Sequence, residues 1–204
     1  MLRRKPAEDR KAELVAAVLL LADRIGPDRL TTNDVAREVG VTQAAIFRHF
    51  PTKAALWLAV ADTVAAGMDA AWQQALAKAT GPAARVRALV VAQLRQIEAT
   101  PALPAILHSR ELNAGDAALR DRFRRLLMQF QSLLVANLEG MLAEGSLRAG
   151  VLPQDAAVLL TSLVQGIAIR WSLGTRAFAI VPEGRRLLEV QMALFAAGGK
   201  HDES

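Results

Sequence analysis

The sequence has no cysteine and no tyrosine, and its 204 residues include only three tryptophans, six phenylalanines and three histidines. Without cysteine there can be no disulfide, no zinc–thiolate site and no cysteine nucleophile. The absence also fits a protein of the reducing cytosol. Few aromatic residues, together with abundant leucine, alanine and valine, favour helices over sheets.

Motifs for catalysis are also missing. His108 precedes Ser109, Arg110 and Glu111, but the chain has no nucleophile elbow, no metal-ligand spacing and no phosphate-binding loop. His49 and His201 lie far from it in the sequence. We therefore expect no enzymatic activity, no bound metal and no cofactor.

The charge is unequal, with 25 basic and 20 acidic residues, a net charge of +5 and a pI near 10.4. A basic balance permits a polyanionic partner. The basic start and the apolar stretch 14–22 resemble a signal peptide, but Glu8, Asp9 and Glu13 interrupt the pattern. The uncharged stretch 156–169 is shorter than the about 20 residues of a membrane span. We expect a soluble, cytoplasmic protein without a membrane partner.

Apolar residues recur at helical spacing along most of the chain, and no strand pattern is present. Breaker pairs and capping residues divide the pattern into helices. The expected helices are 8–25, 32–39, 42–50, 52–80, 83–99, 103–112, 116–144, 153–173 and one from 182 or 183 to 197. The sequence therefore predicts an all-α fold with a small head (1–51), a larger helical body (52–197) and a flexible tail (198–204).

The head contains the most specific pattern, a helix-turn-helix between Thr32 and Phe50. Such a motif joins two short helices through a tight turn. Gly40 can adopt the left-handed conformation that ends the first helix, and Thr42 can cap the second. Ala36 is small where the helices would touch. An apolar core is expected from Val35, Val39, Val41, Ile46 and Phe50.

The combination of Thr32, Ala36, Gly40, Thr42, His49, Phe50 and Lys53 resembles the N-terminal signature of the TetR family of transcriptional regulators. The resemblance covers about residues 13–56. The body agrees with the family only in the order and length of its helices. The resemblance implies a three-helix DNA-binding head on a helical body that binds a ligand and dimerises.

The resemblance also implies which residues face DNA. Phosphate contacts are expected from Thr32, His49 and Lys53. Contacts with base edges or the nearby DNA backbone are expected from Asn33, Gln43, Ala44, Ala45 and Arg48. Thr42 belongs to the same surface. Gln43 can pair with adenine and Arg48 with guanine.

One position departs from the family. Phe47 stands where the family usually has tyrosine, so the hydroxyl that would bind a phosphate is missing, and we expect van der Waals contact with the DNA backbone instead. A separate basic cluster near the N-terminus is either a solvated arm or an additional DNA contact. Its members are Arg3, Arg4, Lys5, Arg10 and Lys11.

In the body, the resemblance implies a cavity for a small molecule. An apolar lining would suit a hydrophobic or aromatic effector. Any one of the candidate residues can equally be ordinary core. The candidates are Gln93, Ile97, His108, Phe123, Met128, Phe130, Gln131, Gln165 and Trp171.

The helices near 155–173 and 183–197 are the candidates for a homodimer interface. The first is apolar nearly all round and needs cover on several sides. The second offers Leu187, Leu188, Val190, Met192, Leu194 and Phe195. The resemblance implies a four-helix interface with the symmetry mate; the alternative is a monomer whose own helices supply the cover.

Together these observations predict a sequence-specific DNA-binding transcriptional regulator, a repressor released from a palindromic operator by a small hydrophobic or aromatic effector. One alternative is a DNA-binding architectural or partner-binding protein without an effector. Another is a carrier of hydrophobic ligands with a vestigial head. The sequence does not identify the operator, the effector or the regulated genes.

Overall fold

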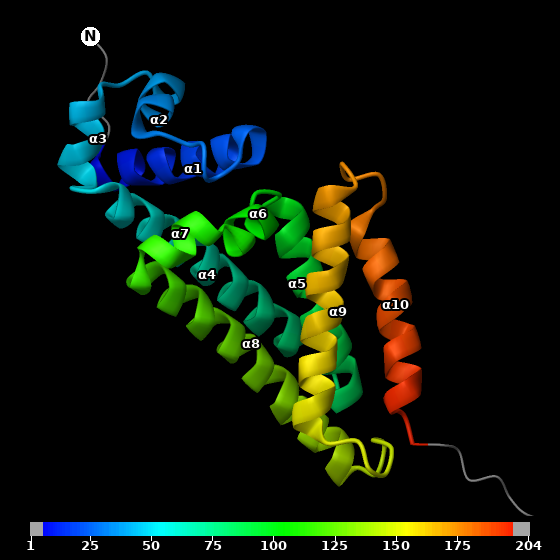
Figure 1. Ribbon diagram of the computed structural model, residues 1–204. Coiled ribbons are helices and arrows are strands. Elements are labelled where there is room, and N and C mark those ends of the chain that lie inside the picture. Colours follow the sequence, from blue (N-terminus) through cyan, green and yellow to red (C-terminus); the bar gives the residue numbers. More distant parts are fainter. Residues whose placement is uncertain (1–5, 198–204) are drawn as a thin grey trace, which may run out of the picture. The chain divides into compact units, whose positions relative to one another are not determined.

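The computed structural model describes residues 6–197, and within that range the protein is helical (Figure 1). The one β feature there is a single bridge between Leu147 and Ala196, so the all-α fold class is confirmed. The helices are α1 (Ala7–Ile25), α2 (Thr32–Val39), α3 (Gln43–His49), α4 (Lys53–Lys78), α5 (Pro82–Ala99), α6 (Leu103–His108), α7 (Arg110–Gly115), α8 (Ala117–Ala143), α9 (Pro153–Leu173) and α10 (Ile180–Phe195).

The helices form two compact units. Among the described residues, the first contains 6–67 together with Thr100–Leu126, and the second contains Met68–Ala99 together with 127–197. Each unit is therefore built from two segments of the sequence. Two of the boundaries between the units fall inside helices, at residue 67 in α4 and at residue 126 in α8. The expected division at residue 51 into a DNA-binding and a ligand-binding domain stays a prediction, and the expected tail lies outside the described residues.

In the first unit, α1 forms the support for the short helices α2 and α3. Its buried residues, which include Leu14, Val18 and Leu21, recur at helical spacing and form one apolar face. The helix contacts α2, α3 and α6. It ends at Gly26, whose φ of 86° only glycine adopts readily.

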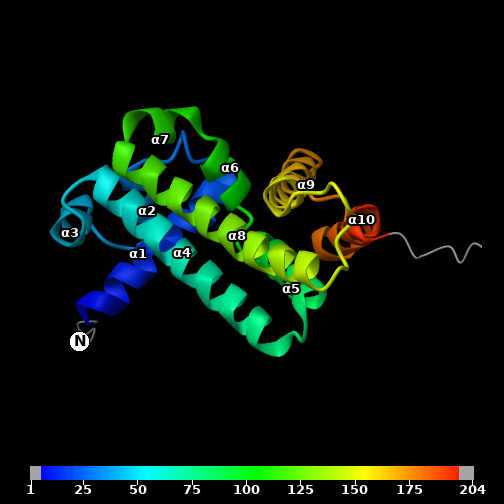
Figure 2. The ribbon, with the colours of Figure 1, turned by 90° about the horizontal axis from the view of Figure 1, so that it is seen from below.

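In the second unit, α10 packs against both α5 and α9. Figures 1 and 2 show α9 and α10 side by side along most of their length. Gly184 permits the close approach of α10 to α5, since a methyl group at this position would collide with the side chain of Leu94. Leu188 and Met192 continue the buried face of α10.

Helices α4 and α8 run side by side in the same direction. In the first unit Arg122 on α8 donates to Asp62 on α4 over 2.6 Å, and in the second unit Gln129 donates to Asp69 over 2.6 Å. Both pairs are separated by 60 residues in the sequence. Because the sequence separation is the same at both contacts, residue numbers rise in the same direction along the two helices, and the helices are therefore parallel.

Two expected helices differ from the structure. The expected helix 103–112 is broken at Ser109, whose buried hydroxyl accepts a hydrogen bond from the Leu112 amide over 3.0 Å and donates to Asp28. This side chain caps α7, so α6 and α7 are separate helices. The last helix starts at Ile180, two residues before Pro182, because a proline is tolerated in the first turn of a helix.

Three helices, α4, α8 and α9, are long and apolar enough to cross a membrane by length and composition alone. The uncharged stretch 156–169, which is itself shorter than a membrane span, lies inside the longer helix α9 of 21 residues. In α9, 44% of the most apolar window is buried inside the protein. The rest of that window is half-buried or exposed.

Candidate nucleic-acid interface

The start of α2 is fixed by a capping box. The Thr31 hydroxyl accepts a hydrogen bond from the Asp34 amide over 3.2 Å, and the Asp34 carboxylate accepts one from the Thr31 amide over 3.0 Å. Hydrogen bonds from the Thr31 side chain and backbone hold the pKa of Asp34 below its ordinary value, with a further contribution from Arg37. The sequence predicts Thr32 as the start of this helix. Thr32 is the first helical residue, but the capping hydroxyl belongs to Thr31, which the spacing of Thr31 and Asp34 could have indicated.

The turn between α2 and α3 has the expected geometry. Gly40 adopts the left-handed conformation, with φ 71° and ψ 36°. The Val41 amide then donates to the Ala36 carbonyl over 2.9 Å, which satisfies a carbonyl at the end of α2. The Thr42 hydroxyl accepts from the Ala45 amide over 3.2 Å and caps α3. Both predicted capping roles, of Gly40 and of Thr42, are confirmed.

The inner faces of α2 and α3 meet in an apolar core. Val35, Ala36, Ile46 and Phe50 are buried, as expected. Val39 and Val41 are only half-buried, because they lie at the end of α2 and in the turn. This packing fixes the face of α3 that points away from the core.

The outward face of α3 carries four of the predicted DNA-facing residues. Gln43, Ala44, Phe47 and Arg48 are exposed, and 40% of Phe47 is open to solvent. No residue of α3 is acidic. The surface is therefore smooth near Ala44, apolar at Phe47 and cationic at Arg48.

The remaining predicted residues lie at the edges of this face. Asn33 is exposed near the start of α2, whereas Ala45 and His49 are half-buried on α3. Lys53 is exposed at the first position of α4, where the Thr52 hydroxyl caps the helix by accepting from the Ala55 amide over 3.0 Å. The free amides and the dipole at such a helix start favour an anion.

Thr32 and Gln43 meet across the turn. The Gln43 side-chain amide donates to the Thr32 hydroxyl over 2.6 Å. The bond joins the first residue of α2 to the first residue of α3. The structure thus brings together two residues that the sequence predicts for different roles, one on phosphate and one on a base.

The N-terminal basic cluster is only partly described. Arg3, Arg4 and Lys5 lie outside the described residues. Arg10 forms an ion pair with Glu13 at 2.8 Å, and Lys11 forms one with Glu8 at 3.1 Å. The charges of the two described members are therefore matched by carboxylates on the same helix.

In the body, two of the predicted ligand residues meet at Trp72. Gln93 accepts a hydrogen bond from the Trp72 indole over 2.9 Å, and the ring of Phe130 lies 5.3 Å from that of Trp72. Gln93 also approaches the sulfur of Met68 at 3.8 Å. Trp72 is fully buried, and its indole contacts both Gln93 and Phe130.

The other predicted ligand residues are dispersed. His108, Met128 and Gln165 are exposed, and Gln131 is half-buried. The buried members are Ile97, Phe123 and Trp171. The role of all nine residues in ligand binding stays a prediction.

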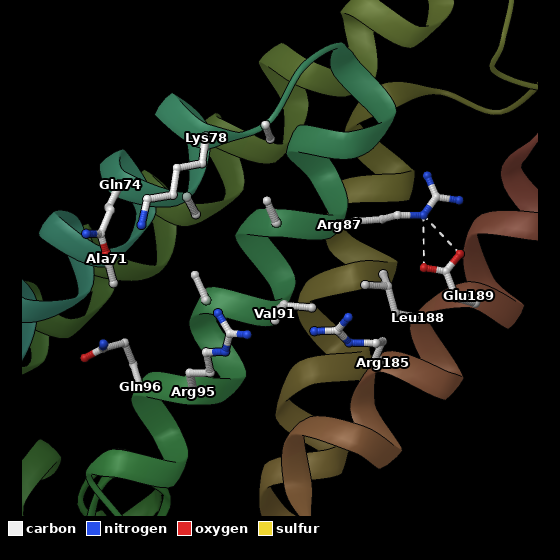
Figure 3. Close-up of a pocket in the computed structure, with 14 residues that line it drawn as sticks. Ala71, Gln74, Lys78, Arg87, Val91, Arg95, Gln96, Arg185, Leu188 and Glu189 are labelled. Carbon is white, nitrogen blue, oxygen red and sulfur yellow. Dashed lines mark hydrogen bonds and ion pairs between the residues drawn. The ribbon is translucent and has the colours of Figure 1, made fainter.

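A groove of about 430 Å³ lies elsewhere in the second unit, between α4, α5 and α10 (Figure 3). None of the nine predicted ligand residues lines it. Its basic residues are Lys78, Arg87, Arg95 and Arg185, and its acidic residue is Glu189. Sequence patterns did not reveal this site, because its residues come from three helices far apart in the chain.

Helices α9 and α10 expose apolar side chains as well as burying them. Val158 and Leu159 on α9 are about half exposed, at 52% and 49%, and Val190 and Leu194 on α10 are 54% and 55% exposed. Of the other residues proposed for the interface, three pack inside their own chain and Leu187 is half-buried. The three buried residues are Leu188, Met192 and Phe195.

The capped helix pair, the exposed face of α3 that carries Arg48 and no acidic residue, and the long helical body define a helix-turn-helix transcriptional regulator. Residues 14–60 match the model of bacterial regulatory proteins of the TetR family, and residues 82–190 match that of the C-terminal part of BetI-type transcriptional repressors. The chain belongs to the TetR family of transcriptional regulators. The expected resemblance is therefore confirmed.

Individual relatives agree with this assignment. The nucleoid occlusion factor SlmA of Marinobacter nauticus is 32% identical over 157 residues, which are 77% of each chain. A TetR transcription regulator from Haloarcula marismortui has the same fold, with a TM-score of 0.79, 22% identity and coverage of 93% of this chain and 99% of that one. The ketosteroid transcriptional regulator KstR2 of Mycobacterium tuberculosis has a TM-score of 0.78 at 16% identity, covering 93% and 96%. By name, these relatives are two transcription regulators and a nucleoid occlusion factor.

Proposed function

We propose that the protein is a cytoplasmic homodimeric repressor that binds a palindromic operator and leaves it when a small hydrophobic or aromatic effector binds the body. The observation that carries the proposal is the outward face of α3, which is exposed, free of acidic residues and capped at its start by Thr42. A short helix of this kind fits the major groove. The match of the body to BetI-type repressors supports repression.

The DNA contacts divide by chemistry. Gln43 and Arg48 reach base edges, because an amide pairs with adenine and a guanidinium with guanine. The small side chains of Ala44 and Ala45 let the start of α3 approach the groove floor. Lys53, His49 and Thr32 hold phosphates, and Asn33 and Thr42 lie beside them.

The dimer is proposed from the exposed apolar side chains of α9 and α10. Val158 and Leu159 on α9, with Val190 and Leu194 on α10, form a surface that favours burial against a second copy. A two-fold axis would relate the two heads, and each would read one half-site of a palindrome. This interface also accounts for the apolar character of α9 without a membrane.

The effector is proposed from the helical body and its relatives. KstR2 is named a ketosteroid transcriptional regulator. An effector as large as a ketosteroid would require space among the middle helices of this protein. Trp72, which donates a hydrogen bond to Gln93 and contacts the tilted ring of Phe130, is the side chain that would have to move. Helix α4 continues without a break from Lys53 to Lys78, so a shift at Trp72 would be carried along the helix to the position that follows α3.

The test has two parts. Selection of bound sequences from a random DNA library should yield a palindrome, with affinity that falls steeply as salt rises. Compounds that raise the melting temperature should then weaken operator binding, and the operator should weaken their binding by the same factor. Recovery of no preferred sequence would contradict the proposal.

The alternative function is supported by the SlmA relatives, which are named nucleoid occlusion factors. In that case the protein is an architectural or partner-binding DNA protein without an effector. Compounds that bind tightly to the body and leave operator affinity unchanged would favour this alternative.

A further inference from the structure

The groove between α4, α5 and α10 has an unequal charge. Four basic residues and one acidic residue line it. Arg87 and Glu189 neutralise each other, since the Arg87 Nε lies 3.0 Å from both carboxylate oxygens. The charges of Lys78, Arg95 and Arg185 remain.

Among the described residues, many arginines pair with a carboxylate, but Lys78, Arg95 and Arg185 do not. Within residues 6–197, neither a hydrogen bond nor an ion pair engages the charged groups of Lys78, Arg95 and Arg185. Figure 3 shows the guanidinium groups of Arg95, on α5, and Arg185, on α10, pointing toward each other across the groove. Two like charges that face each other repel, and an anion placed between them would turn this repulsion into attraction.

Besides its charged residues and two glutamines, Gln74 and Gln96, the groove is lined by apolar and mostly small side chains. Alanines from α4 and α5 line it together with Val91 and Leu188. The volume of about 430 Å³ lies in the range of roughly 300–1,000 Å³ that ligand sites occupy. Small side chains leave room for a slim apolar body beside the charged groups.

We propose that this groove binds a small amphiphilic anion, with a carboxylate or phosphate head between Arg95 and Arg185 and an apolar body along the alanine-rich wall. Guanidinium groups suit both heads, because each can donate two parallel hydrogen bonds to a planar or tetrahedral oxyanion. Lys78 adds a third positive charge. The inference goes beyond the proposed function, because the site does not require that its ligand alter DNA binding.

The experiment titrates the full chain, without DNA, with decyl phosphate and decanoate below their micellar concentrations. Isothermal calorimetry should detect binding of both anions, whereas decanol and decyltrimethylammonium should bind at least about tenfold more weakly. Arg95→Gln and Arg185→Gln should each raise the Kd of decyl phosphate about tenfold. Arg125→Gln, which removes an exposed arginine on α8 outside the groove, should leave it unchanged.

A variant that is expected to bind the anion more tightly distinguishes a loss of anion recognition from a loss of folding. Glu189→Gln removes the carboxylate that engages Arg87, so Arg87 becomes available and decyl phosphate should bind more tightly than to the wild type. Loss of folding cannot produce tighter binding. The proposal is overturned if neither anion binds, if decanol binds as well as the anions, or if Arg95→Gln and Arg185→Gln retain wild-type affinity.

Discussion

Gln43, the first residue of α3, donates a hydrogen bond of 2.6 Å from its side-chain amide to the hydroxyl of Thr32, the first residue of α2. The bond uses one of the two N–H groups of the amide. The other N–H and the carbonyl oxygen remain, and these are the donor and acceptor that pair with adenine in the major groove. Thr32 thus positions the side chain that is proposed to read a base.

The first prediction follows from this contact. Gln43→Ala should weaken operator binding by about 1–3 kcal/mol and relax the preference at one or two positions of each half-site. Thr32→Val should weaken binding and also relax part of the same preference, because Gln43 loses its fixed orientation. Competition binding with operator variants measures both effects.

A double-mutant cycle checks the contact itself. Residues in direct contact couple by about 0.5–3 kcal/mol, so the double variant should lose less affinity than the two single variants combined. Full additivity would mean that Thr32 and Gln43 act on DNA independently.

Lys53 provides the second prediction. It is exposed at the start of α4 and is proposed to contact phosphate, which carries no sequence information. Lys53→Ala should weaken binding to all sequences about equally and reduce the slope of log K against log salt by about 1. Arg125→Ala, an exposed arginine on α8, serves as the control with the same change in charge. If the Lys53→Ala variant keeps the wild-type salt slope, Lys53 does not contact DNA phosphate.

The third prediction concerns the dimer. Val190→Glu combined with Leu194→Glu places two carboxylates on the exposed apolar surface of α10 without disturbing its buried face. Sedimentation should show monomers, and operator affinity should fall about a hundredfold or more, because a single half-site binds weakly. The control is Leu142→Glu, at a residue on α8 that is 51% exposed. If the double variant stays dimeric with full affinity, the interface lies elsewhere.

The fourth prediction is a pH dependence in the head. The pKa of Asp34 is lowered by hydrogen bonds from Thr31, so the carboxylate stabilises the folded state at pH values above its ordinary pKa of about 3.8. This contribution is lost as the pH falls through the lower pKa of the folded state. Asp34→Asn should therefore be less stable than the wild type near neutral pH, and the difference should shrink as the pH falls below about 4.

Urea unfolding at several pH values measures this difference, with Glu139→Gln, an exposed carboxylate near the C-terminal end of α8, as the control. If the difference in unfolding free energy between Asp34→Asn and the wild type does not change with pH, the charge of the carboxylate does not contribute to the stability of the capping box.

The helix-turn-helix is predictable because its determinants are local. Gly40 ends α2 and Thr42 caps α3 through contacts within a few residues, so the sequence alone locates both helix ends. Helix α2 starts at Thr32 as expected, and the adjacent Thr31 caps it through its contact with Asp34, three residues away. Ser109 breaks the helix expected over 103–112 through a bond to Asp28, a partner 81 residues away that no local pattern reveals.

The body is less predictable for the same reason. Gln93 is polar and Phe130 is aromatic, and the sequence suggests both as cavity residues, but in the structure both contact the buried side chain of Trp72. Arg95 and Arg185 lie in one groove although they are far apart in the sequence. Such sites depend on how distant helices pack, and helix periodicity identifies only which face of each helix is buried.

The central claim, that the exposed face of α3 reads DNA sequence, is tested most directly at Arg48. The measurement is selection from one random DNA library with the wild type and with Arg48→Ala in parallel. The account predicts a palindrome for the wild type and, for the variant, loss of preference at one base pair in each half-site, placed symmetrically, with the rest of the palindrome intact. An identical selected sequence for both proteins, or no selected sequence for the wild type, would contradict it.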